Sequence, residues 1–68
     1  MKLIEREWNA CTNKYMHVWL ADDESGIVAD FDANSSECSA IIVISTNSTY
    51  MKNAQGKWQK VGTTEVIA

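Results

Sequence analysis

The sequence contains no proline, only three glycines and a single histidine among its 68 residues. It also has no internal repeat and no low-complexity stretch. A chain of this length forms one domain, so we expect a single unit over residues 1–68. No apolar run approaches the roughly 18 residues of a membrane span, and the first residues do not resemble a signal peptide. We therefore expect no membrane contact and synthesis in a reducing, cytoplasmic compartment.

Cysteine and histidine are too few to stabilise a small domain in the usual ways. A zinc site needs three or four such ligands at short spacings, whereas the chain offers Cys11, Cys38 and His17. In a reducing compartment, two cysteines are more typical of free thiols than of a disulfide, although the sequence leaves their pairing open. Because a domain of this size buries only about 60% of its unfolded surface, we expect oligomerisation to stabilise it.

An incomplete calcium-loop pattern occurs at Asp30–Asn34. The spacing begins like an EF-hand loop, but Ser35 stands where the loop needs glycine and Ile41 where it needs a bidentate glutamate. We therefore predict a solvated acidic loop here, with no metal site and no cofactor.

Positive charge is also scarce. Six Lys and Arg residues against nine Asp and Glu give a formal net charge of −3. Nucleic-acid binding needs a basic surface for phosphates, so we predict no nucleic-acid partner. The acidic residues suggest one alternative function, a small inhibitor or adaptor that presents carboxylates to a basic surface of another protein. Its candidate contact consists of Asp22, Asp23, Glu24, Asp30 and Asp32.

The sequence offers no catalytic constellation. His17 lies in the middle of a strand pattern, and neither cysteine has the glycine-rich or cationic surroundings that activate a thiol. The chain contains no phosphate-binding glycine loop, and it is too short to build a glycosidase groove around a carboxylate pair. We predict that the protein is not an enzyme.

Strand patterns recur along the chain. Tyr15–Leu20 alternates with bulky residues on both faces, and Ala40–Thr46 is apolar on both faces. Residues 2–8 and 27–31 fit a strand or a helical turn, and we favour strands. Residues 39–62 read as a three-stranded antiparallel meander, and 63–68 as a frayed end or an arm that joins a neighbour's sheet. The predicted fold is mainly β, with about five or six short strands in a barrel-like or sandwich-like domain.

A strand with two apolar faces in so short a chain predicts a subunit contact. The residues expected at this contact are Trp19, Ile41, Val43 and Tyr50. The three tryptophans, Trp8, Trp19 and Trp58, are expected in the core or at the subunit interface. A carbohydrate-binding module that stacks sugars on Trp8 or Trp58 is a further alternative.

Three consecutive segments, Cys38–Thr46, Ser48–Met51 and Gln55–Gly62, resemble small β-rich structural proteins of tailed bacteriophages, of the head-fibre or decoration kind. Their shared pattern runs from small-Ser-apolar-apolar-Val-Ile to apolar-Tyr-Met and then to Gly-x-Trp. The lead-in around Trp19–Asp22 and Val28–Asp30 is also similar, so the resemblance covers about two-thirds of the chain.

The resemblance implies a non-enzymatic virion component that is made in the host cytoplasm and incorporated into the particle. Its expected place is the capsid surface, a head fibre or the tail. Its expected partners are copies of itself, with a trimer as one candidate assembly, and other virion proteins. The acidic alternative then corresponds to a phage-encoded factor that binds a host protein.

Overall fold

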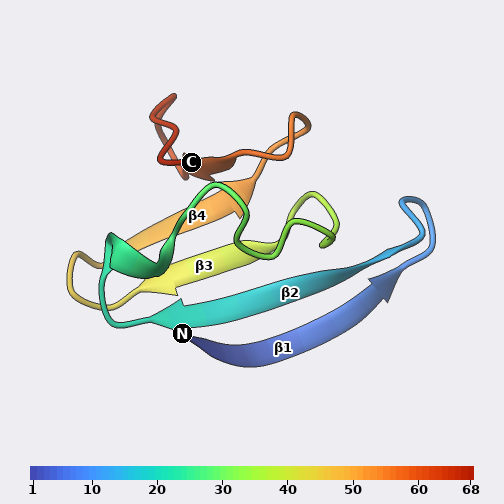
Figure 1. Cartoon of the computed structure of the whole chain (residues 1–68), viewed down its shortest axis with the longest axis horizontal. Helices are drawn as coiled ribbons and strands as arrows, with labels where there is room; N and C mark the ends of the chain where they lie inside the picture. The colour runs from blue at the N-terminus through green and yellow to red at the C-terminus, as the bar shows by residue number, and fades with distance from the viewer.

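The computed structural model describes all 68 residues as one five-stranded sheet. The strands are β1 (Lys2–Asn9), β2 (Lys14–Ala21), β3 (Ala40–Val43), β4 (Ser48–Lys52) and β5 (Trp58–Lys60), and they lie side by side in chain order (Figure 1). The one helical element is a 3₁₀ turn, η1 (Glu24–Gly26). The prediction of a mainly β fold is confirmed.

The sheet is mixed rather than purely antiparallel. β3, β4 and β5 form the predicted antiparallel meander, and β1 pairs antiparallel with β2. β2 and β3, however, run parallel, with Trp19 beside Ile41 and Ala21 beside Val43. Parallel neighbours need a long crossover connection, and residues 22–39 supply it.

The crossover, residues 22–39, contains turns and no strand. The strand predicted at 27–31 is therefore wrong. Its alternating apolar residues act instead as separate anchors, because Ile27 is buried and Phe31 packs against the core while Val28 stays exposed. Asp32 and Cys38 take positive φ angles of 51° and 71°, which bend the segment across the sheet.

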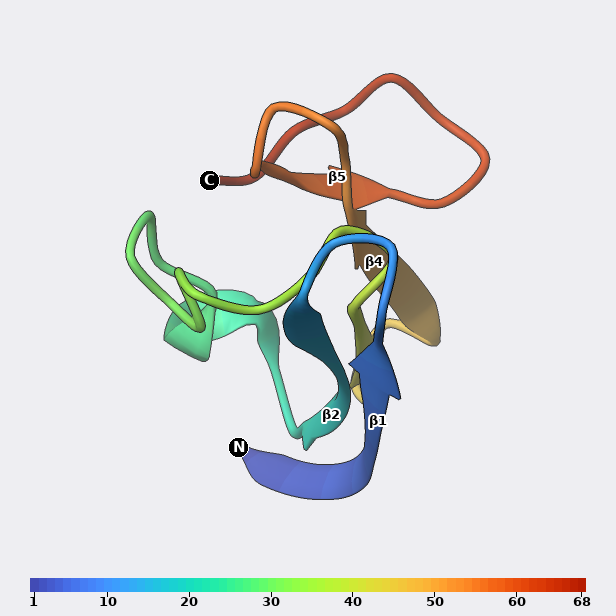
Figure 2. The same ribbon diagram turned by 90° about the vertical axis from the view of Figure 1, so that its right-hand side faces the viewer.

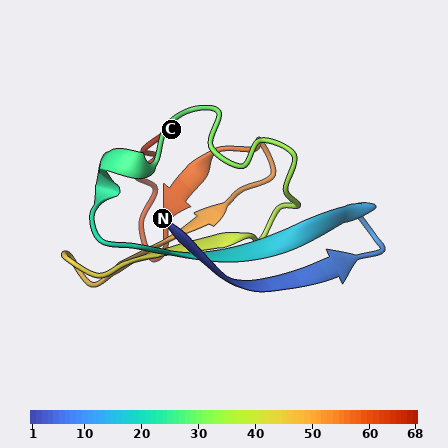
Figure 3. The same ribbon diagram turned by 60° about the horizontal axis from the view of Figure 1, so that its bottom comes forward.

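The hydrophobic core lies between the crossover and one face of the sheet, which we call the covered face. Figures 2 and 3 show the crossover on this side of the strands. The core consists of Ala21, Ile27, Ile41, Val43, Tyr50 and Trp58, with Trp19, Phe31 and Ala68 packed against it. Four strands, the crossover and the C-terminal residue therefore share one small core.

The structure corrects the predicted subunit contact. Ile41 and Val43 are 0% exposed and Tyr50 is 1% exposed, while Trp19 is partly buried against the same cluster. The protein's own crossover covers this face, so Ile41, Val43 and Tyr50 have no surface to offer a second subunit, and Trp19 keeps only part of its surface. On the inner strands β3 and β4, the exposed apolar residues Ile42 and Met51 lie on the other face.

The two ends of the chain also differ in part from expectation. The N-terminal segment forms a strand, as predicted, with an irregularity in its register between Leu3 and Glu5. The C-terminal tail is neither frayed nor extended to a neighbour. It folds back along β5, where Trp58 N–H donates to Ala68 O at 3.0 Å and Ile67 N–H donates to Trp58 O at 2.9 Å.

Strand β3 ends at Val43, three residues before the end of the predicted strand at Thr46. Residues 44–47 instead make the turn into β4, and Asn47 takes a φ of 53°. Asparagine tolerates this left-handed conformation better than the preceding β-branched residues do.

The two faces of β3 give a direct test of this fold. Val43→Asp places a charge in the core, and its cost exceeds about 4 kcal/mol. A chain of 68 residues has a total stability of roughly 3–10 kcal/mol, so we expect this variant to be unfolded by circular dichroism. The neighbouring Ile42→Asp lies on the other face and is expected to keep the native spectrum. Similar spectra for both variants would contradict the assignment of the two faces.

Candidate functional site

The face of the sheet opposite the crossover is apolar and uncovered, and we call it the open face. Its apolar side chains are Met16, Val18, Leu20, Ala40, Ile42 and Met51, which alternate with the core residues along β2, β3 and β4. Leu20 lies beside Ile42, and Ala40 lies opposite Met51. Ile42 and Met51 are 37% and 38% exposed although both lie on inner strands of the sheet.

Polar residues border the open face on both sides. On the β1 side, Glu5 lies opposite Val18 and Glu7 lies opposite Met16. On the other side, Thr49 of β4 and Gln59 of β5 complete the border. An apolar centre with a polar border is the usual composition of a protein–protein interface.

The covered face is held to its crossover by the carboxylate of Asp32. Trp19 Nε1–H donates to Asp32 Oδ2 at 2.8 Å, and His17 Nδ1 lies 2.9 Å from the same oxygen. Burial alone raises the pKa of Asp32, but the hydrogen bonds from Trp19 and His17 and the charge of His17 outweigh it and lower the pKa. Asp32 is therefore ionised and ties the crossover to β2.

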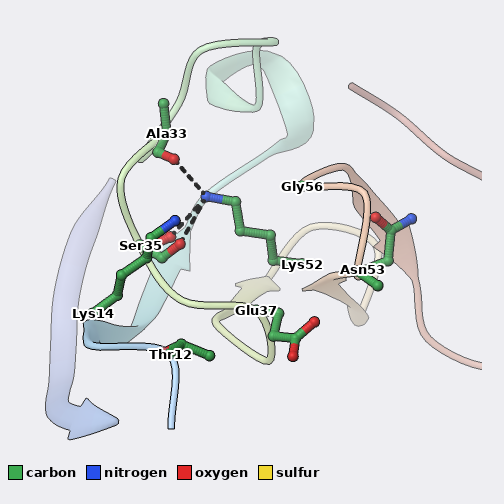
Figure 4. Close-up of a pocket in the computed structure, with 9 residues that line it drawn as sticks. Thr12, Lys14, Ala33, Ser35, Glu37, Lys52, Asn53 and Gly56 are labelled. Carbon is green, nitrogen blue, oxygen red and sulfur yellow. Dashed lines mark hydrogen bonds between the residues drawn. The ribbon is translucent and has the colours of Figure 1, made fainter. Parts of the chain in front are cut away.

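Lys52 provides the second connection between sheet and crossover. Its ammonium group donates to the carbonyl oxygens of Asp32 at 2.7 Å, Ala33 at 3.2 Å and Ser35 at 3.2 Å. It also donates to Ser35 Oγ at 3.0 Å (Figure 4). Burial lowers the pKa of Lys52, while the charge of Asp32 opposes this shift. These bonds satisfy carbonyl groups that the irregular crossover cannot pair in a ladder.

A polar cleft of about 210 Å³ lies beside Lys52. Thr12, Lys14, Glu37 and Asn53 are among the residues that line it (Figure 4). The ammonium of Lys52 points toward the crossover carbonyls, which already accept its hydrogen bonds. The cleft is therefore a by-product of the Lys52 connection and presents no free cation from that residue.

Six rings form a continuous series from the β1–β2 hairpin into the core. Trp8 contacts Tyr15 with ring centroids 5.0 Å apart, and Trp19 contacts Phe31 at 5.1 Å. The full series is Trp8, Tyr15, His17, Trp19, Phe31 and Trp58. His17 is thus a packed ring that also contacts Asp32. The structure gives no hydrogen bond from its Nε2 atom to a hydroxyl or thiol, so it shows no Ser-His-Asp or Cys-His arrangement.

The structure divides the predicted acidic contact. Asp22, Asp23 and Asp30 are exposed. The side chain of Glu24 accepts a hydrogen bond from the Tyr50 hydroxyl, and this bond, together with burial, raises the pKa of Tyr50 to about 12. Asp32 is bound to Trp19 and His17. Asp23 accepts hydrogen bonds from Ser25 but stays exposed. Glu24 and Asp32 are therefore the two carboxylates whose bonds tie them to the sheet, and they are not free to meet a basic surface.

The three tryptophans differ in how far they are exposed. Trp58 is 1% exposed and cannot stack on a sugar, so that part of the carbohydrate alternative is wrong. Trp8 is 50% exposed on the β1–β2 hairpin. Trp19 bridges Asp32 and Phe31 beneath the crossover.

The structure brings together no group of three His, Cys, Asp or Glu side chains that could hold a metal ion. Cys11 and Cys38 are unpaired, and both are exposed. No helix is long and apolar enough to cross a membrane.

Comparison with known protein families, curated proteins and solved structures finds no match for this chain.

Sequence reasoning identified the apolar strand β3 but missed the residues that matter most on each side of it. On the open face it missed Ile42 and Met51, although their alternation with Ile41 and Tyr50 was visible in the sequence. On the covered face it missed Lys52, which shares a face with Tyr50 two residues earlier. A lysine in that position signals a buried, hydrogen-bonded charge.

Replacing Lys52 tests the connection between sheet and crossover. Lys52→Met keeps most of the side-chain volume but leaves the buried Ser35 carbonyl without its donor, whereas Asp32 O keeps its bonds from Ser35. We therefore expect a loss of about 1–3 kcal/mol in the free energy of unfolding. Urea denaturation measures this loss. Lys57→Met, at an exposed position in the β4–β5 turn, is the matched control and should change stability by less than about 0.5 kcal/mol. Equal effects of both changes would rule out the connection.

The lowered pKa of Asp32 predicts the response to acid. A carboxylate whose pKa is lower in the folded state stabilises the fold above its unfolded pKa, near 3.8, and loses this effect as pH falls through the folded pKa. We expect wild type to be more stable than Asp32→Asn at neutral pH, with the difference shrinking toward zero in strong acid. The exposed neighbour Asp30→Asn is the control and should show no such trend. A difference between wild type and Asp32→Asn that is independent of pH would contradict the ionised connection.

Proposed function

We propose that this protein is a non-enzymatic structural component of a bacteriophage particle that assembles with copies of itself through the open face. The observation that carries the proposal is the exposure of Ile42 and Met51 on inner strands of the sheet. The setting in a virion rests on the resemblance of residues 38–62, the part of the chain that contains β3, β4 and β5.

A second copy is the occupant that the composition of the open face favours. Two such faces, each apolar at the centre and polar at the border, pack as the two layers of a β-sandwich. Fully burying one Ile or Met side chain stabilises by about 1.5–3 kcal/mol relative to full exposure. Since Ile42 and Met51 are already partly buried, several side chains from each copy must contribute.

The border charges allow this packing. Lys2 projects beside Leu20, on the same side of the sheet as Glu5 and Glu7. A border that carries both signs can pair Lys2 of one copy with a glutamate of the other in a two-fold arrangement. The contact area itself contains no charged side chain, so the association should depend little on salt.

Contacts with other virion proteins then use surfaces outside the open face. The acidic inhibitor is the weaker alternative, because only Asp22, Asp23 and Asp30 of its five proposed residues are exposed.

Light scattering of wild type and Ile42→Asp tests the self-association. We expect wild type to have the mass of an oligomer at low and high salt, and Ile42→Asp to be a folded monomer. Val28→Asp is the matched control, because Val28 is also exposed but lies on the crossover, and it should keep the mass of wild type. A monomeric wild type at all concentrations would overturn the proposal. The virion setting is checked separately, by mass spectrometry of purified particles.

A further inference from the structure

The sheet has one covered edge and one free edge. The C-terminal tail covers the outer edge of β5, where Lys60 N–H donates to Glu65 O at 2.8 Å and Gln59 bridges to Val66. No strand pairs with the outer edge of β1, and all its residues but Asn9 are exposed. A free edge presents unpaired N–H and C=O groups to which an extended segment can add as a further strand.

The part of β1 that can accept such a segment is Glu5–Asn9. Its register with β2 is regular, whereas the register shifts between Leu3 and Glu5. Arg6 and Trp8 project on the side of the covered face, opposite His17 and Tyr15, while Glu5 and Glu7 project on the side of the open face. The edge therefore displays the charge order negative, positive, negative, followed by a large ring.

Two of these side chains are already held in place. The guanidinium of Arg6 lies 3.7 Å from the centre of the Tyr15 ring, and Trp8 packs edge-on against the same ring at 5.0 Å. Side chains that are ordered before binding lose less entropy when a partner arrives.

A second copy of β1 does not fit this edge. In a two-fold antiparallel pair, opposed residues must project from the same face, so they differ by an even number of positions. When the two-fold axis passes beside Glu5, Arg6 or Glu7, that residue lies directly opposite the same residue of the other copy. With the axis beside Arg6, Glu5 of one copy also lies opposite Glu7 of the other. Like charges directly opposed are destabilising. Centring on Trp8 leaves only residues 7–9 of each copy in the ladder.

We propose that the β1 edge binds an extended segment of a different protein, in which an acidic residue is flanked by two basic residues. In antiparallel addition, basic residues lie opposite Glu5 and Glu7, and the acidic residue lies opposite Arg6. A β-branched or aromatic residue lies opposite Trp8. The site shares Glu5 and Glu7 with the polar border of the open face, but its backbone groups lie on the outer edge of β1, so the inference does not require self-association.

A titration with short peptides, followed by amide NMR shifts, tests the proposal. The probe is capped Thr-Val-Lys-Glu-Lys-Val-Thr, and its control is the isomer Thr-Val-Lys-Lys-Glu-Val-Thr, which has the same composition and charge. We expect the probe to shift the amides of Glu5–Trp8 and to bind roughly tenfold more tightly than the isomer, since two cross-strand pairs, those with Arg6 and Glu5, change from opposite to like charge. Equal affinities, shifts elsewhere in the molecule, or no binding would overturn the proposal.

Backbone methylation separates strand addition from a contact of side chains alone. One probe carries N-methyl groups on both lysines, and another carries them on the glutamate and both valines. Alternate N–H groups of an added strand point toward β1, so one of the two methylated peptides should bind and the other should not. If both bind like the parent, no strand is added and the proposal fails.

The protein variant Arg6→Glu supplies the last control. We expect this variant to bind the probe more weakly than wild type does. It should bind more tightly the peptide in which lysine replaces the central glutamate. Binding unchanged by Arg6→Glu would contradict the assigned register. Amide shifts in β1 that depend on protein concentration without peptide would show that a second copy takes the edge, which would also overturn the proposal.

Discussion

The crossover can lie over the sheet because side chains of the sheet hydrogen-bond to it, although it pairs with no strand. Residues 22–39 contain no strand and only one short 3₁₀ turn, so most of their carbonyl groups have no ladder to join. Lys52 reaches three of these carbonyls from β4, and Asp32 accepts hydrogen bonds from β2 side chains. Without these hydrogen bonds, water would have to solvate the polar backbone groups of the segment that joins the parallel strands β2 and β3.

Because the crossover packs on one side of the sheet, the two faces differ in burial. The crossover brings Ile27 and Phe31 over the side of the sheet that carries Ile41, Val43 and Tyr50, and residues 1–68 place no such segment over the other side. The C-terminal tail hydrogen-bonds along β5, and β1 adds a strand to the sheet instead of packing over a face of it. A chain of 68 residues thus completes one core and leaves a second apolar layer exposed.

The sequence predicted strands well wherever alternation was local. Tyr15–Leu20 and the meander of residues 39–62 follow from period-two patterns and turn residues, and both are confirmed. It could not predict which face of β3 is buried, because Ile41 and Val43 are no more apolar than Ile42 and Ile44. That choice depends on which side the crossover takes, and the crossover is held by Asp32 and Lys52 from distant positions. The alternation at 27–31 was misleading for the same reason: Ile27 and Phe31 are spaced to reach the core from an irregular segment.

The two edges of the sheet limit how an assembly can grow. Self-association through both a face and an edge would let copies add without end, as open-ended sheets do. The tail removes the β5 edge, and the charges of Glu5, Arg6 and Glu7 oppose self-pairing at the β1 edge. Under the proposed self-association, contacts between copies are confined to the open face, where a two-fold or other closed arrangement would bury the apolar surface. An edge that disfavours its own copy but stays accessible to a strand of opposite charge order would confine the proposed hetero-association to β1. The proposed role in a larger particle requires this combination, because such a component must limit its own self-association and still bind a different protein.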